Sequence, residues 1–315
     1  MPCRSRGRLL AAAIAMLAML GSVHAAPDSV ARRAPPYDIS RIVSIGGAVT
    51  EILYALGLDR NIVGIDTTSL YPPQAAAEKA SVGYMRQLSA EGVLGLAPSL
   101  ILAVEGSGPR EAMAVLQAAH VPLVVVPDTF SGDGIVDKVR VVAETTGAVE
   151  GGRCLAAKVR ADVDALGTLV GRVRTPKRVL FVLSFAGGRA MAAGGNTAAD
   201  GIIRMAGAVN AVAGYDGYKP LTDEAVAATK PDTILAMTRA GPNPVTADEV
   251  FAQPAFAATP AAANRSFIAM DGLYLLGFGP RTARAARDLA LALYPDLPHE
   301  PLPPGDTAPP GSCAK

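Results

Sequence analysis

The chain contains one stretch of sequence twice, and this near-repeat limits the possible folds more than any other feature does. Residues 86–104 align with residues 219–237 without a gap, and seven of the nineteen positions are identical. Each copy has a Ser or Thr that can cap a short helix, then a Pro, then an apolar run typical of a buried strand. We expect two equivalent lobes, with a chance likeness as the alternative. The matched pairs are Leu88/Leu221, Glu91/Glu224, Val93/Val226, Pro98/Pro231, Ile101/Ile234, Leu102/Leu235 and Ala103/Ala236.

Strand and helix patterns alternate along both halves of the chain. Buried strands that alternate with helices are typical of parallel sheets covered on both faces. We therefore predict an α/β fold of two Rossmann-like lobes, each with a central parallel sheet. The predicted strands are residues 41–45, 62–65, 99–104, 121–126, 178–184, 234–237 and 267–270, and the predicted helices are residues 50–58, 111–120 and 282–293.

One long helix is expected to join the lobes. Apolar residues recur at helical spacing through residues 133–172, with breaks at Gly147 and at Gly151-Gly152. A ligand would bind in the cleft between two such lobes, since domain interfaces are common binding places. The predicted organisation is an N-terminal lobe (38–150), a linking helix (151–173), a C-terminal lobe (177–295) and a Pro-rich, disordered tail (296–315).

The first 25 residues have the pattern of a secretory signal peptide. Three Arg precede an apolar run of twelve residues, Leu9 to Leu20, and Val23-His24-Ala25 supplies the small residues of a cleavage site. An uncleaved anchor is the alternative, but the run is shorter than the ~20 residues that a membrane span needs. We predict cleavage after Ala25 and a periplasmic location.

Composition and motifs argue against several classes of function. The formal charge of +1 becomes −2 without the signal peptide, and a basic stripe for nucleic acid is missing. The sequence has no Walker loop, G-x-S-x-G or H-E-x-x-H motif, so we expect a binding protein and not an enzyme. The mature chain keeps His120 and His299, too few for a His-rich metal site. It also keeps Cys154 and Cys313, and the sequence leaves open whether they pair.

Residues 83–88, Gly-Tyr-Met-Arg-Gln-Leu, form the most informative segment for chemistry. Tyr84 precedes a capped helix, so we expect it to be accessible at the edge of its lobe. A tyrosine phenolate is a hard oxygen ligand for ferric iron and a known axial ligand of haem. Arg86 could stabilise the phenolate or pair with a carboxylate. Residue type alone leaves an ordinary packing role for Tyr84 open.

The chain resembles the periplasmic haem-binding proteins of Gram-negative haem ABC importers, which belong to the helical-hinge class of substrate-binding proteins. The segment around Tyr84 is the specific part of the resemblance, which extends over about residues 40–295. Three stretches shared more widely support it: Ile-Val-Ser-Ile-Gly-Gly-Ala-Val-Thr-Glu-Ile-Leu-Tyr-Ala-Leu-Gly (42–57), Met-Ala-Ala-Gly-Gly-Asn-Thr-Ala-Ala-Asp (191–200) and Ile-Leu-Ala-Met-Thr-Arg (234–239).

The resemblance implies a role for each matched residue. Tyr84 would be the axial ligand of haem iron, and Arg86 would face a propionate. Arg239 would approach Tyr84 from the other lobe. Glu91 and Glu224 would dock on an ABC importer, a permease dimer with a cytoplasmic ATPase, and the carrier would be a monomer. For both acids an ordinary place at a helix N-terminus is the alternative.

One departure from the family concerns the second iron ligand. Some relatives supply a histidine from the C-terminal lobe, but this sequence has no His between residues 121 and 298. Iron would be five-coordinate through Tyr84 or carry water or a weak sixth ligand, for which Met191 is a candidate. The competing hypotheses are a same-fold carrier of cobalamin or a ferric siderophore, a secreted haem chaperone or sensor, and an uncharacterised α/β enzyme.

Overall fold

The computed structural model describes residues 36–186, 189–238, 245–299, 309 and 311–314. They belong to one compact unit, Ala34–Lys315. The predicted signal peptide lies outside the described residues. Within the described part of the chain, no helix is long and apolar enough to cross a membrane.

The N-terminal half forms a five-stranded sheet in the order β3-β2-β1-β4-β5, and all its strand pairs are parallel. Every residue of β1 and β4 is buried, as their largely apolar sequences predict for central strands covered on both faces. The strands are β1 (Ile42–Ile45), β2 (Ile62–Ile65), β3 (Ala80–Ser81), β4 (Leu100–Val104) and β5 (Leu123–Val126), and the helices are α1 (Gly47–Ala55), α2 (Pro73–Glu78), α3 (Ala90–Leu94) and α4 (Arg110–Ala118), with a 3₁₀ turn at Asp59–Asn61.

The C-terminal half forms a second sheet in the order β11-β10-β6-β7-β9, with β8 paired to β6. Strands β6, β10 and β11 are parallel, whereas β7 is antiparallel to both of its neighbours. The predicted α/β class is confirmed, and the β6–β7 hairpin is an addition that the sequence patterns did not indicate. The strands are β6 (Arg178–Ala186), β7 (Arg189–Ala193), β8 (Val209–Asn210), β9 (Tyr218–Pro220), β10 (Thr233–Thr238) and β11 (Phe267–Asp271).

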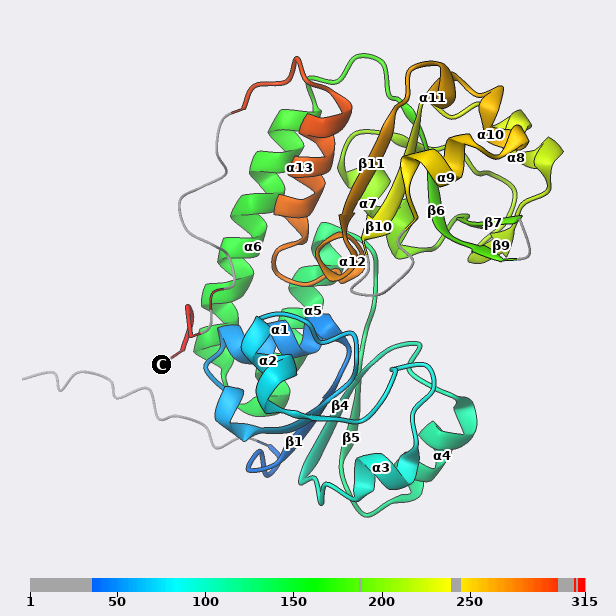
Figure 1. The fold of residues 1–315 in the computed structure, drawn as a ribbon. Helices are drawn as coiled ribbons and strands as arrows, with labels where there is room; N and C mark the ends of the chain where they lie inside the picture. The colour runs from blue at the N-terminus through cyan, green and yellow to red at the C-terminus, as the bar shows by residue number, and fades with distance from the viewer. Residues whose placement is uncertain (1–35, 187–188, 239–244, 300–308, 310, 315) are drawn as a thin grey trace, which may run out of the picture. The chain divides into compact units, whose positions relative to one another are not determined.

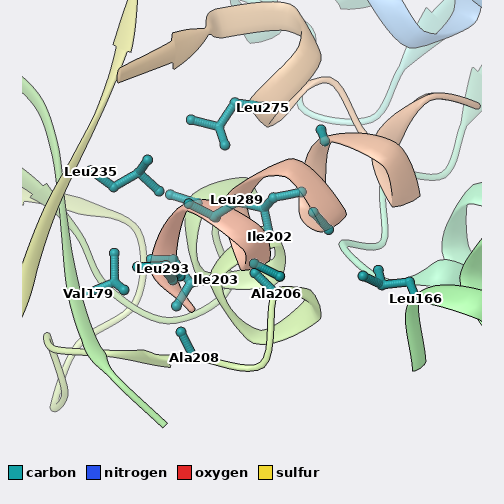
Figure 2. Close-up of a cluster of buried hydrophobic side chains, with 14 of the residues drawn as sticks. Leu166, Val179, Ile202, Ile203, Ala206, Ala208, Leu235, Leu275, Leu289 and Leu293 are labelled. Carbon is teal, nitrogen blue, oxygen red and sulfur yellow. The ribbon is translucent and has the colours of Figure 1, made fainter. Parts of the chain in front are cut away.

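The helices of the C-terminal half cover both faces of this sheet. One face carries the cluster drawn in Figure 2, in which Ile202 and Leu289 from two helices meet Val179 and Leu235 from two strands. The other face packs on Phe256 and Val250. The helices are α7 (Ala198–Met205), α8 (Asp223–Thr229), α9 (Ala247–Phe251), α10 (Pro254–Ala257), α11 (Pro260–Ala263), α12 (Gly272–Leu276) and α13 (Thr282–Leu293).

The predicted long helix is α6, Val149–Val170, with 22 residues. It follows α5 (Gly132–Thr146), which ends at Gly147 in the left-handed conformation that glycine favours. Leu155 of α6 belongs to a hydrophobic core of the N-terminal half, whereas Leu166 belongs to a core of the C-terminal half. Figure 1 shows α6 beside α13. The helix therefore takes part in both cores.

Charged groups also join the two halves directly. Lys138 of α5 is fully buried, and its ammonium group donates hydrogen bonds to Asp128 at 2.5 Å and to the Phe278 carbonyl at 3.1 Å. Glu51 of α1 accepts two hydrogen bonds from Arg281, at 3.1 Å each. The sequence patterns gave no sign of either group, because buried charges do not follow hydrophobic periodicity.

The end of the chain departs from the predicted disordered tail. Cys313 is buried and forms a disulfide bond with Cys154 of α6. The backbone N–H groups of Gly311 and Cys313 donate hydrogen bonds to the carbonyls of Tyr54 and Ala55 at the end of α1. Residues 311–314 are therefore fixed against the N-terminal half, and the question that the sequence left open about the two cysteines is answered.

Candidate ligand-binding site

The near-repeat corresponds to the same local structure in both halves. Ser89 caps α3 by accepting a hydrogen bond from Gly92 N–H, and Thr222 caps α8 through Ala225 N–H, at 3.2 Å in each case. Each helix leads through a buried Pro into a central strand, β4 or β10. The expectation of equivalent helix–Pro–strand units is thus confirmed.

The segment around Tyr84 is a tight loop fastened at several points. Gly83 adopts φ +88°, and its carbonyl accepts a hydrogen bond from Thr67 N–H at 2.9 Å. A turn closes through Gln87 N–H and the Tyr84 carbonyl at 2.8 Å. Met85 and Gly108 are also joined by a backbone hydrogen bond at 2.9 Å. These bonds hold the loop in one conformation without using its side chains.

The side chains of this loop divide into an inner and an outer set. Met85 packs against both hydrophobic cores of the N-terminal half, and Leu88 is buried. Tyr84, at 42% relative exposure, and Arg86 are exposed. The loop therefore presents a phenol and a guanidinium to solvent, as the sequence predicts, on a backbone anchored by its apolar neighbours.

One tyrosine of the C-terminal half interacts electrostatically with this loop. Tyr218 of β9 is partly buried, and its charge environment includes both Arg86 and Tyr84. Burial and the Tyr84 phenol raise the pKa of Tyr218, whereas Arg86 and hydrogen bonds with Ala199 and Thr197 lower it, and the net shift is upward. Sequence reasoning did not single out Tyr218, which lies one residue before the second copy of the near-repeat.

The sequence also predicted Arg239 and Met191 near the iron. Arg239 lies outside the described residues, so its expected approach to Tyr84 stays a prediction. Met191 is on β7, where it pairs with Pro220 of β9 and is partly buried. Within the residues that the structure describes, no group of three His, Cys, Asp or Glu side chains could hold a metal ion.

Glu91 and Glu224 occupy matching places on the two capped helices. Each is exposed in the first turn of its helix, α3 or α8. Hydrogen bonds from its own backbone N–H and from the Thr222 side chain lower the pKa of Glu224. Both halves therefore carry an accessible carboxylate in the first turn of a matching helix, α3 or α8; Figure 1 shows where these two helices lie.

A shallow hollow of about 440 Å³ lies elsewhere on the C-terminal half. It is lined by Gly195 and residues 212–216, and Asp216 in its wall accepts a hydrogen bond from Asn196 at 2.6 Å. Its lining combines the side chains of Val212, Tyr215 and Asp216 with Gly195, Ala213 and Gly214. The loop of Tyr84 is the stronger candidate site.

Substrate-binding proteins of transport systems have two α/β lobes, and here a long helix, α6, takes part in both. Each half also carries a matching capped helix, α3 or α8. The chain belongs to the periplasmic binding protein family, whose model matches residues 42–273. Among curated relatives, an uncharacterised ABC transporter substrate-binding lipoprotein of Bacillus subtilis is 26% identical, with 81% of this chain and 80% of the relative covered. A vitamin B12-binding protein of Yersinia pestis is 27% identical, with 64% and 70% covered.

Solved structures give a closer match. Periplasmic heme-binding protein RhuT from Roseiflexus sp. RS-1, in apo form, is 41% identical with a TM-score of 0.75, covering 81% of this chain and 98% of that one. Periplasmic heme-binding protein BhuT, solved in complex with two hemes, is 40% identical with a TM-score of 0.74, covering 80% and 97%. Each alignment covers nearly all of the heme-binding structure and about four-fifths of this chain.

Proposed function

We propose that this protein binds haem through the Tyr84 phenolate and delivers it to an ABC importer in the cell envelope. The observation that carries the proposal is the anchored loop that exposes Tyr84 and Arg86 together. The two solved heme-binding proteins at 40–41% identity support haem as the ligand class. No catalytic step is needed, because the task is reversible binding.

The chemistry of the loop suits a ferric porphyrin. A phenolate oxygen is a hard anionic ligand for ferric iron, and a guanidinium pairs well with a propionate carboxylate. Met85 and Leu88 face the protein interior, so they keep the backbone in place while Tyr84 and Arg86 reach the ligand. Arg239 would add a second cation from the C-terminal half.

A titration of the purified mature protein with hemin tests the proposal. The wild type should give a saturable shift of the Soret band, and Tyr84→Phe should lose it, because the ligand oxygen is removed. Tyr37→Phe is a matched control, since Tyr37 is exposed to a similar extent, at 37%. A Tyr84→Phe titration identical to that of the wild type would contradict iron ligation by Tyr84. An Arg239→Ala variant should bind more weakly or show a changed spectrum.

Glu91 and Glu224 are proposed as the contacts to the transporter, one from each tip. A permease dimer presents its docking sites in symmetric pairs, so one carboxylate per half fits that symmetry. The double variant Glu91→Ala/Glu224→Ala should keep hemin binding but lose stimulation of the reconstituted importer's ATPase. Glu111→Ala, which changes an acid in the first turn of α4, is the control. Undiminished stimulation in the double variant would refute the docking role.

Cobalamin is the second candidate ligand, and the vitamin B12-binding relative favours it. The same titration distinguishes the two ligands: cobalamin binding without any response to hemin would replace haem with cobalamin. Binding of a ferric siderophore complex, without binding of hemin or cobalamin, would instead identify a siderophore carrier.

A further inference from the structure

Asp66 is a buried carboxylate in the turn that follows β2, with 1% relative exposure. Its Oδ1 atom accepts hydrogen bonds from Gly46 N–H at 2.8 Å and from the Ser69 hydroxyl at 2.9 Å. Its Oδ2 atom accepts from the backbone N–H and the hydroxyl of Thr68, at 2.9 Å and 2.7 Å. Because Gly46 caps α1, the carboxylate ties residues 66–69 to the start of that helix.

A chain of buried hydroxyl groups continues from Asp66 into α1 and β1. The Ser69 hydroxyl lies 2.7 Å from that of Thr50, and the Thr50 hydroxyl lies 2.8 Å from that of Ser44. A carboxylate can only accept hydrogen bonds, and a hydroxyl donates one hydrogen. The Ser69 hydroxyl therefore donates to Asp66 and accepts from Thr50. The Thr50 hydroxyl in turn accepts from Ser44, so the carboxylate sets the direction of the whole chain.

The segment that Asp66 fixes is bonded directly to the Tyr84 loop. Thr67, the next residue, donates its backbone N–H to the Gly83 carbonyl at 2.9 Å. Gly83 has φ +88° and immediately precedes Tyr84. The Gly83 carbonyl and the Tyr84 N–H belong to one planar peptide group. The bond from Thr67 therefore orients the peptide from which the Tyr84 side chain starts.

We propose that Asp66 is a positioning residue for the iron ligand, because its carboxylate holds Thr67 where its N–H orients the peptide that leads into Tyr84. This inference rests on the proposed function, in which Tyr84 binds haem iron. Asp66 is too deeply buried to touch a ligand, so it acts through the loop. A phenol that is already oriented need not be ordered when haem arrives, and such preorganisation increases affinity.

Asparagine is the sharpest substitution at this position, because it has the shape of aspartate but carries an NH₂ group in place of one oxygen. Each oxygen of Asp66 accepts from one backbone N–H, that of Gly46 or that of Thr68. Whichever way the amide is turned, its NH₂ group faces a backbone N–H, which can only donate. Asp66→Asn should therefore loosen residues 66–69 with almost no change in side-chain volume.

The test is a hemin titration of the mature protein, together with the charge-transfer band of the iron–phenolate bond. Asp66→Asn should bind hemin roughly tenfold more weakly, the result expected when about a tenth of the molecules hold the loop correctly. Its charge-transfer band should shift, because the phenolate meets the iron at a changed angle. Thr68→Val removes one donor to the carboxylate and should change both readouts in the same direction by a smaller amount.

Two matched variants control for a general loss of stability. Asp162 is a buried carboxylate that pairs with Arg284 of α13 at 3.0 Å. The buried Thr146 hydroxyl donates to the Val142 carbonyl of its own helix at 2.8 Å. Asp162→Asn and Thr146→Val should lose stability in urea unfolding but keep the hemin affinity and the charge-transfer band of the wild type.

The outcomes separate this inference from the function on which it rests. Folded Asp66→Asn and Thr68→Val proteins with wild-type affinity and band would overturn the positioning role and leave ligation by Tyr84 intact. Equal weakening in Asp162→Asn would also overturn it, because general instability would then explain the loss. A Tyr84→Phe titration identical to that of the wild type would overturn the proposed function itself. Should Asp66→Asn fail to fold, Thr68→Val decides the question.

Discussion

Lys138 is a fully buried lysine that holds parts of both halves together. Its ammonium group bonds with Asp128, whose side chain is 22% exposed, and with the Phe278 carbonyl. Burying a charge is costly unless it is paired and hydrogen-bonded, and here both conditions are met. Removal of the ammonium group leaves a carboxylate and a carbonyl without their donor.

Substitution of Lys138 by Met should therefore destabilise the protein strongly. Breaking a buried pair by removing one partner costs about 3 kcal/mol. Urea unfolding followed by circular dichroism measures this loss. Arg140→Met on the same helix is the control, because its pairs with Glu144 and Asp137 are exposed and worth less than ~1 kcal/mol. Equal losses of unfolding free energy in the two variants would mean that the buried Lys138–Asp128 pair contributes no more stability than the exposed pairs of Arg140.

Tyr54 of α1 makes the stability of the fold sensitive to alkaline pH. Burial raises the pKa of Tyr54 to about 12, assisted by the charges of Glu78 and Asp59. Its hydroxyl is buried and has no hydrogen-bond partner among the described residues. The protonated phenol is thus favoured in the folded state, so its contribution is complete below pH ~10 and is lost as pH rises towards 12.

A Tyr54→Phe variant should retain more stability than the wild type between pH 10 and 12. At pH 7 the two proteins should differ by less than ~1 kcal/mol, since the lost hydroxyl had no partner. Thermal unfolding across this pH range provides the measurement. Tyr37→Phe should follow the wild type, because Tyr37 is exposed. An equal alkaline loss in Tyr54→Phe and wild type would rule out Tyr54 as a cause.

The packing of α5 against α6 depends on a glycine at the point of closest approach. A Cβ atom at Gly152 would come within 2.3 Å of the Ala143 Cβ, so the two helices would have to separate. Gly167 is on the same helix, and no described atom lies within 4 Å of a Cβ placed there. The structure therefore leaves no room for a side chain at Gly152 but leaves open space at Gly167.

Alanine at these two positions should change stability in opposite directions. Gly152→Ala should destabilise by about 1–3 kcal/mol through overpacking. Gly167→Ala should stabilise by about 0.5–1 kcal/mol, because alanine favours the helix. Denaturant unfolding of both variants checks the signs. A stabilising Gly152→Ala would show that the helices can move apart without cost.

Hydrophobic patterns predicted most strands of four or more residues, including the edge strands β5 and β11, but missed β7 and the shortest strands. The predicted strands at 41–45, 62–65 and 178–184 correspond closely to β1, β2 and β6. Strands β3, β8 and β9 have two or three residues each, too short for a periodic signal. Several short helices were also not predicted, because they too are too short for a periodic signal.

The candidate site was predictable only in its N-terminal part. Tyr84 and Arg86 were accessible to sequence reasoning because they form a distinctive contiguous segment. Tyr218, 134 positions after Tyr84, interacts electrostatically with Tyr84 and Arg86, and no local pattern encodes that relation. Lys138 and Glu51 were missed because their partners, Phe278 and Arg281, are likewise distant in sequence.

The two halves are held by α6, by buried charges and by a covalent bond near the chain end. Replacing both Cys154 and Cys313 by Ala should cost about 2–5 kcal/mol of unfolding free energy, because the bond closes a long loop. Wild type unfolded in a reductant should show the same loss. A double variant as stable as the oxidised wild type would show that hydrogen bonds alone fix residues 311–314.

The Cys154–Cys313 bond turns most of the C-terminal half into a covalent ring, since the residues between the two cysteines lie within one closed loop. A protease that cuts once inside this ring opens it without releasing a fragment. Such a nicked molecule would migrate as one species on a non-reducing gel and as two after reduction. A protein that works outside the cytoplasm meets proteases. Because of this ring, a first cut would leave every segment attached, whereas without the disulfide the same cut could release a lobe.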